Sequence, residues 1–171
     1  MRGSATDRVV TPRRGVRGAI AVSLAVGWLT VCGLAVAGCG ASAPAKRDVI
    51  ARGNAICLSA LRAVRSQPPP SAAGSLPALA DYLKRVVPIV DKEVAAVRAL
   101  PRPAHDRALL DRYVSALTAT GAEYRTLAAA AARGDRSAVA QALAALRAST
   151  AAPAAARYGL SDCAGSGATV T

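Results

Sequence analysis

Apolar residues recur at steps of three and four positions through most of residues 46–158, the spacing that places them on one face of an α-helix. The periodic stretches are separated by short linkers that contain proline or glycine, the residues that most often interrupt a helix. Four helices are therefore predicted, at residues 46–65, 76–100, 104–133 and 136–158. No stretch alternates apolar with polar residues as a strand would. The pattern predicts an all-α fold, an antiparallel four-helix bundle.

Residues that favour helix ends stand at the predicted boundaries. Ser75 is placed to cap the second helix, and Asp135 is placed to cap the fourth. Gly134 is suited to the left-handed conformation that often ends a helix. Pro88 and Pro153 lie inside predicted helices, and we expect each to kink its helix, because proline lacks the N–H and clashes with the preceding turn.

The amino-acid composition limits how much the core of such a bundle can bury. Alanine occupies 43 of the 171 positions, and phenylalanine is absent. Alanine is the best helix former, but each alanine removes little apolar surface from water. The sequence therefore predicts stable helices that surround a thin core.

The N-terminus has the charge pattern of an export signal. The first 18 residues contain five arginines and one aspartate, and the stretch from Gly18 to Ala45 contains no charged residue. Its apolar part, residues 19–39, is long enough to cross a bilayer. The segment is therefore expected to be either a cleaved signal or a retained membrane helix.

The end of this apolar run is the sequence Val36-Ala37-Gly38-Cys39. It resembles a bacterial lipobox, in which an aliphatic residue and two small residues precede a cysteine that receives diacylglycerol on its sulfur. In that family a peptidase then cuts before the cysteine. The resemblance implies a signal peptide at residues 1–38, lipidation at Cys39, a flexible tether at residues 39–45 and a location on the outer face of the cytoplasmic membrane.

Other ways of processing the N-terminus stay open. An ordinary signal peptidase would accept the small residues at Ala37 or Ala45, and cleavage there would release a soluble secreted protein. Without cleavage the apolar run would remain as a membrane anchor. The pair Arg13-Arg14 leaves both the twin-arginine and the general export routes possible.

Two further cysteines lie in the part of the chain that would be exported. Cys57 is on the apolar face of the first predicted helix, and Cys163 follows the fourth. In an antiparallel bundle the fourth helix returns beside the first, and an oxidising exterior favours a disulfide. The bridge would close a loop of about 107 residues and stabilise the fold by about 4–5 kcal/mol. The alternative is a pair of free thiols.

The chain is rich in alanine and arginine and poor in lysine. It also contains the lipobox, the early Cys57 and the sequence Gly159-Leu160-Ser161-Asp162-Cys163. This combination resembles a group of small, uncharacterised lipoproteins of actinobacteria over residues 46–163. The resemblance implies a disulfide-linked helical domain and no particular activity. Residues 164–171 are predicted to form a disordered tail.

Few residues in this chain could carry out catalysis. His105 is the only histidine, is predicted to be exposed, and cannot form a metal site alone. Asp91 and Glu93 are predicted to be solvated. We therefore expect no catalytic residues, no metal and no cofactor. The expected role is that of a non-catalytic interaction or envelope-associated module, and the alternative is a bundle that binds a small apolar ligand.

The chain carries a formal charge of +12, with 22 basic and 10 acidic residues. Nucleic acid is not an expected partner, because the protein is predicted to be exported and has few aromatic residues for base stacking. Anionic lipid headgroups or acidic wall polymers are the expected partners, through Lys46, Arg47 and Arg52 directly after the tether. The alternative is a basic surface that is simply solvated.

Overall fold

The computed structural model describes residues 45–72 and 74–166, which all belong to one compact unit, Gly40–Thr171. Every buried residue of its core lies between Val49 and Cys163, so a chain that begins at residue 40 retains the whole core. The predicted signal peptide and Cys39 lie outside the described residues. Among the described helices, none is long and apolar enough to cross a membrane.

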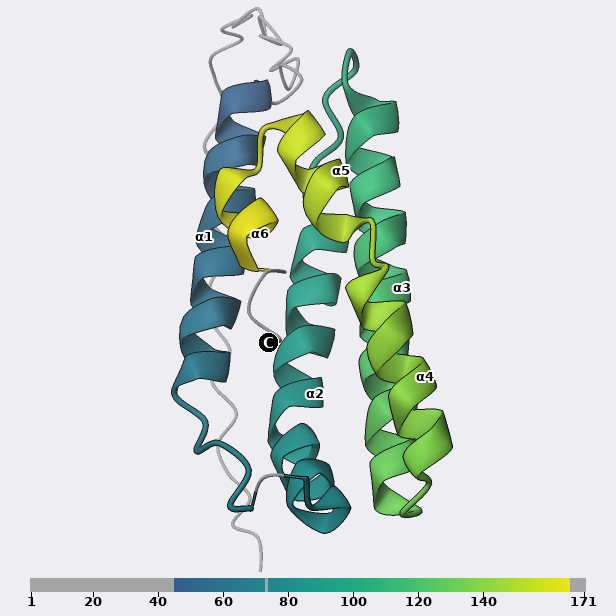
Figure 1. Ribbon diagram of the computed structural model, residues 1–171. Coiled ribbons are helices and arrows are strands. Elements are labelled where there is room, and N and C mark those ends of the chain that lie inside the picture. Colours follow the sequence, from purple (N-terminus) through teal and green to yellow (C-terminus); the bar gives the residue numbers. More distant parts are fainter. Residues whose placement is uncertain (1–44, 73, 167–171) are drawn as a thin grey trace, which may run out of the picture. The chain divides into compact units, whose positions relative to one another are not determined.

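The described residues form a helical bundle without strands, as the apolar periodicity predicted (Figure 1). The helices are α1 (Lys46–Arg65), α2 (Leu76–Arg98), α3 (Arg107–Ala132), α4 (Arg136–Arg147), α5 (Ala151–Tyr158) and α6 (Ser161–Ser166). The first three coincide closely with predicted helices. α6 extends three residues into the segment predicted to be a tail, and the rest of that segment lies outside the described residues.

The predicted end signals of the helices are confirmed. The Ser75 hydroxyl accepts a hydrogen bond from the backbone N–H of Ala78 at 3.3 Å, and the Asp135 carboxylate accepts one from Ala138 at 3.0 Å. Gly134 adopts a positive φ of 71° directly after Arg133, the residue that caps the end of α3. Because these groups satisfy backbone atoms that have no partner within the helix, they fix where α2 and α4 begin and where α3 ends.

The predicted fourth helix is wrong in one respect, because it consists of two helices. α4 ends at Arg147 and α5 begins at Ala151, so Pro153 lies in the first turn of α5 instead of kinking a continuous helix. A proline is tolerated in a first turn, where its missing N–H would have no helical acceptor. Pro88, by contrast, lies within α2, which continues from Leu76 to Arg98.

The buried side chains form two clusters. The first lies among α1, α2, α3, α5 and α6 and contains the bulkiest buried residues, which include Leu110, Tyr113, Tyr158 and Leu160. The second lies among α2, α3 and α4 and consists of small and aliphatic residues: Ala80, Leu83, Leu127, Ala130, Ala131, Val139 and Ala142. The second cluster is the thin, alanine-rich core that the composition predicted.

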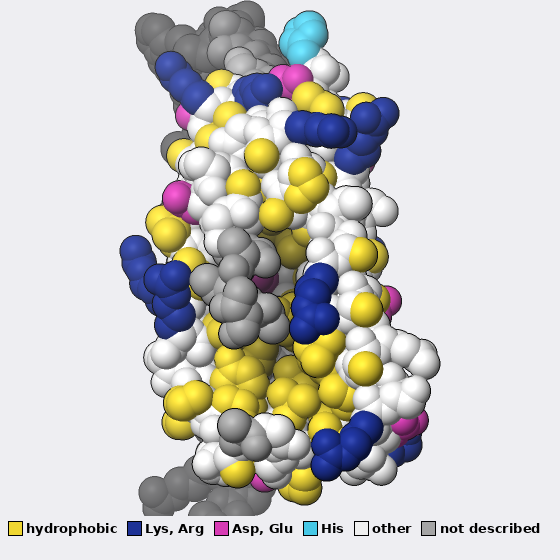
Figure 2. Space-filling view, in the orientation of Figure 1, with side chains coloured by type: hydrophobic (Ala, Val, Ile, Leu, Met, Phe, Trp, Pro, Cys, Tyr) yellow, Lys and Arg dark blue, Asp and Glu magenta, His cyan; other side chains and the backbone are white. Residues whose placement is uncertain are grey.

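α1 packs against α2 and α6, whereas α4 and α5 pack against α3. The end of α5 contacts α1, since Lys46 lies over the Tyr158 ring, but the short α6 packs along α1 where the fourth helix was expected. α1 has no buried residue after Cys57, and its later apolar residues Leu61 and Val64 stay half-buried. Figure 2 shows hydrophobic side chains at the surface in the hollow between the second half of α1 and α4.

Candidate functional site

The strongest link between distant parts of the chain joins α1 to α6. Cys57 and Cys163 form a disulfide across a sequence separation of 106 residues, and their Cα atoms are 5.1 Å apart. The Tyr113 hydroxyl of α3 lies 3.5 Å from the Cys57 sulfur. A sulfur in a disulfide carries no hydrogen, so the hydroxyl is the donor, and this contact connects α3 to the same point.

Two neighbours of Cys57 allow α6 to approach so closely. Asn54 accepts a hydrogen bond from the backbone N–H of Asp162 at 3.2 Å and donates to the Ser161 hydroxyl at 3.4 Å, so it caps the start of α6. Gly53 is buried, and a Cβ atom there would lie 2.5 Å from Cδ2 of Leu160. Sequence reasoning missed both roles. The polar Asn54 within the apolar stripe of the first helix was the available signal.

The three basic residues predicted to meet anionic partners differ in the structure. Lys46 forms an ion pair of 3.3 Å with Asp106 and lies 5.3 Å from the centre of the Tyr158 ring. Arg47 lies 3.5 Å from the neighbouring Asp48 carboxylate. Arg52 is exposed and has no ion pair with another described residue. Lys46 therefore helps hold α1 to the α2–α3 loop and to α5, and its charge is partly neutralised.

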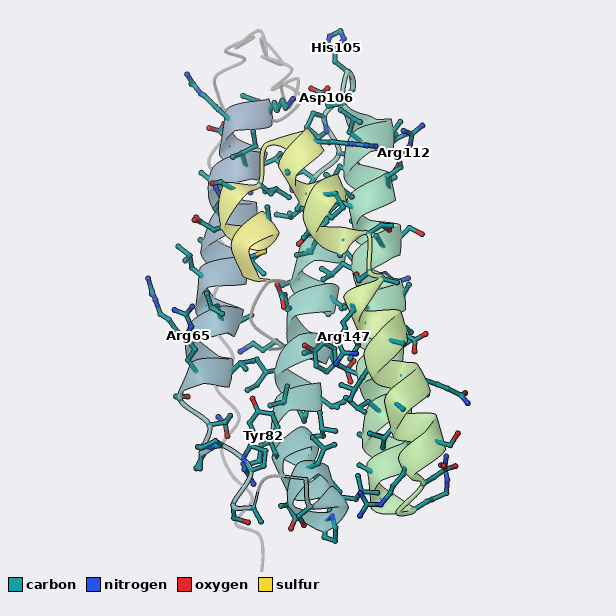
Figure 3. All side chains as sticks on the ribbon, in the orientation of Figure 1. Arg65, Tyr82, His105, Asp106, Arg112 and Arg147 are labelled. Carbon is teal, nitrogen blue, oxygen red and sulfur yellow. A yellow bond between two sulfur atoms is a disulfide. The ribbon has the colours of Figure 1, made fainter. Side chains whose placement is uncertain are left out.

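The end of the domain that carries Lys46 also contains a buried hydroxyl without a partner. Tyr158 is 1% exposed, and its hydroxyl makes no hydrogen bond to any described residue. Burial raises the pKa of Tyr158, Asp106 raises it further, and Arg102 opposes both. His105 is exposed at this end, as predicted, and Figure 3 shows it beside Asp106 and near Arg112.

A surface groove of about 510 Å³ runs between α3 and α5, and we call it the α3–α5 groove. Its lining residues come from one stripe of each helix and from the α4–α5 linker: Leu109, Arg112, Ser115, Ala116, Ala119, Thr150, Pro153, Ala154 and Arg157. Arg112 and Arg157 are exposed, and neither forms an ion pair or a side-chain hydrogen bond with a described residue. The groove depends on the helix break at residues 148–150, which the sequence did not predict.

A second, less polar groove of about 360 Å³ lies between α4 and the start of α2. Its lining includes Leu76, Leu79, Val139, Ala140 and Leu143, and Arg136 is its charged residue. Both grooves are open at the surface. The first core cluster, in contrast, is filled by buried tyrosine and leucine side chains.

Glu93 contradicts the prediction that it is solvated. It is half-buried on α2, has no hydrogen bond or ion pair with a described residue, and has a pKa that burial raises to about 7. Tyr113 and Tyr124 of α3 lie close enough that Glu93 adds to the rise that burial causes in the pKa of each. Asp91 lies two residues earlier and points to another face, because residues two apart do not share a helix face. It forms an ion pair with Arg125 of α3.

The other predicted site residues, Val36, Ala37, Gly38 and Cys39, lie outside the described residues. Within the described part of the chain, no three His, Cys, Asp or Glu residues come together as a metal site would require. Near His105, the Asp111 carboxylate is also paired, since it accepts a hydrogen bond from the Arg102 side chain at 2.8 Å.

The chain matches no protein-family model, no curated protein and no solved structure.

Proposed function

We propose that this protein is a lipoprotein of the cell envelope, anchored through Cys39 to the outer face of the cytoplasmic membrane, with a non-catalytic helical domain that serves as an interaction module. The observation that carries this proposal is the Cys57–Cys163 disulfide in a chain whose apolar N-terminal run ends in a lipobox-like sequence. Structural disulfides persist in oxidising compartments and are rare in the cytosol. The disulfide thus agrees with export, which the N-terminal sequence independently predicts.

We further propose that the domain is an antiparallel four-helix bundle in which α4 and α5 together act as the fourth helix. The linkers between α1 and α2, α2 and α3, and α3 and α4 are short. α1 packs on α2, α2 packs on α3, and α3 packs on α4. Short connections between packed neighbours favour opposite directions.

The non-catalytic assignment rests on where the reactive side chains lie. The acids Asp91, Asp106 and Asp111 are each paired with a basic residue in an ion pair typical of a protein surface. Glu93 lies among tyrosines rather than beside a nucleophile or a second carboxylate. A general acid needs a reacting group within hydrogen-bond reach, and no such constellation surrounds Glu93 among the described residues.

A second candidate function is the binding of a small apolar molecule. The two surface grooves, of about 510 Å³ and about 360 Å³, favour it because both have the size of small-molecule sites. Ala116→Leu and Ala140→Leu each add a larger side chain to one of the two grooves. If the soluble domain binds an uncharged apolar probe and one of these variants weakens the binding, this function is favoured over the interaction module.

The anchoring is tested by expressing the full chain in an actinobacterial host with a labelled fatty acid. The wild type and Cys32→Ala should incorporate the label, whereas Cys39→Ala should not and should accumulate as a precursor. Two or more acyl chains give stable membrane attachment, so the unlabelled variant should also shift toward the soluble fraction if it is cut elsewhere. A wild-type mature chain that begins at Gly38 or Lys46 without lipid would contradict the proposal.

A further inference from the structure

We propose that the α3–α5 groove binds the headgroup of an anionic phospholipid at a bilayer surface. In this arrangement Arg112 and Arg157 bind the phosphate, and the first part of an acyl chain lies along the apolar floor. The inference rests on the proposed function in that it takes the domain to be held close to a membrane.

The charge of the groove calls for an anion. Arg112 on α3 and Arg157 on α5 are both exposed lining residues of one groove, and neither has an acidic partner among the described residues. The acids of this end are already used, since Asp106 pairs with Lys46 and Asp111 with Arg102. Guanidinium groups bind phosphate oxygens in pairs of parallel hydrogen bonds, and a phosphate shared by two arginines would relieve their repulsion.

The floor of the groove distinguishes a lipid from other anions. Beyond the arginines it is formed by apolar side chains, Leu109, Ala116, Ala119, Pro153 and Ala154, with the hydroxyls of Ser115 and Thr150 among them. From Leu109 to Ala119 the α3 wall is about 15 Å long. An acidic wall polymer is polar along its whole length and would leave this floor unmatched. An anionic lipid has one charged end and an apolar remainder.

The position of the groove brings it to the end of the domain that a lipid anchor would hold near the membrane. Lys46 begins α1 and contacts both Asp106, just before α3, and Tyr158, next to Arg157. Figure 3 shows Asp106 and Arg112 at the end where α1 begins, and Arg65 toward the opposite end of α1. The six residues between Cys39 and Lys46 reach at most about 20 Å, which keeps this end within reach of headgroups.

The test uses residues 40–171, which contain the whole described core, and measures co-sedimentation with vesicles of phosphatidylcholine alone or mixed with phosphatidylglycerol. We expect binding only to the mixed vesicles. The double variant Arg112→Ala/Arg157→Ala should reduce the partition coefficient about 30-fold, since each basic residue near an anionic surface contributes about 1 kcal/mol. The matched control Arg62→Ala/Arg65→Ala removes the same charge at the far end of α1 and should reduce it less than about threefold.

A charge-conserving variant separates a built site from a diffuse basic surface. Arg112→Lys/Arg157→Lys keeps both charges but loses the paired hydrogen bonds, and it should still weaken binding severalfold. Circular dichroism of each variant confirms that it is folded. Equal losses from the two alanine double variants, or no binding of the wild type to the anionic vesicles, would overturn the proposal. The proposal would also be overturned if the domain bound a dispersed single-chain fatty acid but did not bind to vesicles.

This experiment and the acyl-labelling experiment fail independently. The soluble domain lacks Cys39, so vesicle binding reports on the groove alone. Loss of labelling in the full chain would remove the anchor while leaving the headgroup site intact.

Discussion

Glu93 is an acidic residue in a partly buried position that does not suit a charged carboxylate. A carboxylate prefers water, yet Glu93 is half-buried without a hydrogen bond or an ion pair to any described residue, and burial raises its pKa to about 7. The folded protein therefore holds the proton of Glu93 more tightly than the unfolded chain, where the ordinary pKa is 4.5. A group with a raised folded pKa contributes stability below its unfolded pKa, and this contribution is lost as the pH rises through the folded value.

We expect the free energy of unfolding to fall by about 3 kcal/mol between about pH 4.5 and about pH 7 because of Glu93. Glu93→Gln removes this titration. Subtracting the pH profile of the variant from that of the wild type, each measured by urea unfolding, isolates the effect. A difference that stays constant across this pH range would show that Glu93 has access to water in the folded protein.

At the scale of the helices, the approach of α6 to α1 depends on a residue without a side chain. Gly53 lies on the α1 face that meets Leu160, which is fully buried and cannot swing into solvent. Alanine normally stabilises a helix interior by about 0.5–1 kcal/mol relative to glycine. Here its Cβ would lie 2.5 Å from Cδ2 of Leu160, so the buried Leu160 side chain or the backbone that carries it into α6 has to shift.

We expect Gly53→Ala to destabilise the domain by about 1–2 kcal/mol despite its better helix propensity. Gly165→Ala is the matched control, because a Cβ at Gly165 meets no atom within 4 Å, and it should be neutral or slightly stabilising. Thermal unfolding followed by circular dichroism measures both. If Gly53→Ala raises the melting temperature as much as the control does, α6 is not packed closely on α1.

The break between α4 and α5 is the part of the fold that the sequence pattern did not predict. Periodicity and end signals located α1, α2 and α3, because Ser75, Gly134 and Asp135 act locally. The linker at residues 148–150 contains no glycine or proline, and a tertiary contact helps fix it, the 2.6 Å hydrogen bond between the hydroxyls of Thr120 and Ser149. Ser149 also accepts from the N–H of Ala151 at 3.2 Å. Serine and threonine shortly before Pro153 were the sequence signal that a new helix begins there.

The candidate groove could not be predicted for the same reason. Arg112 and Arg157 are 45 positions apart, and they line one surface because α5, a separate helix after α4, packs on α3. The disulfide was easier to predict. The chain has two cysteines beyond Cys39, and one lies on an inward face near the start while the other lies near the end.

The stability of the whole molecule depends strongly on the Cys57–Cys163 bridge, because α6 is short and the core beside α4 is mostly alanine. Closing a loop of this length stabilises a fold by about 4–5 kcal/mol in the chain-entropy treatment. We expect Cys57→Ser/Cys163→Ser to lower the free energy of unfolding by about 4 kcal/mol, with helical content largely kept in the cold.

Denaturant unfolding of the oxidised and reduced domain provides the measurement, and alkylation of residues 40–171 is its control. The domain contains no third cysteine, so the oxidised form should show no free thiol even when denatured. Unchanged unfolding midpoints after reduction would mean that helix packing sustains the domain without the bridge.

The disulfide also determines whether a proteolytic cut separates the domain into fragments. The linkers at residues 66–75, 99–106, 133–135 and 148–150 all lie inside the covalent loop that Cys57 and Cys163 close. A single cut in any of these linkers therefore leaves two chains joined through sulfur, and no fragment is shed. On a gel the nick becomes visible only after reduction, and under the proposed anchoring at Cys39 the nicked domain would stay attached to the membrane.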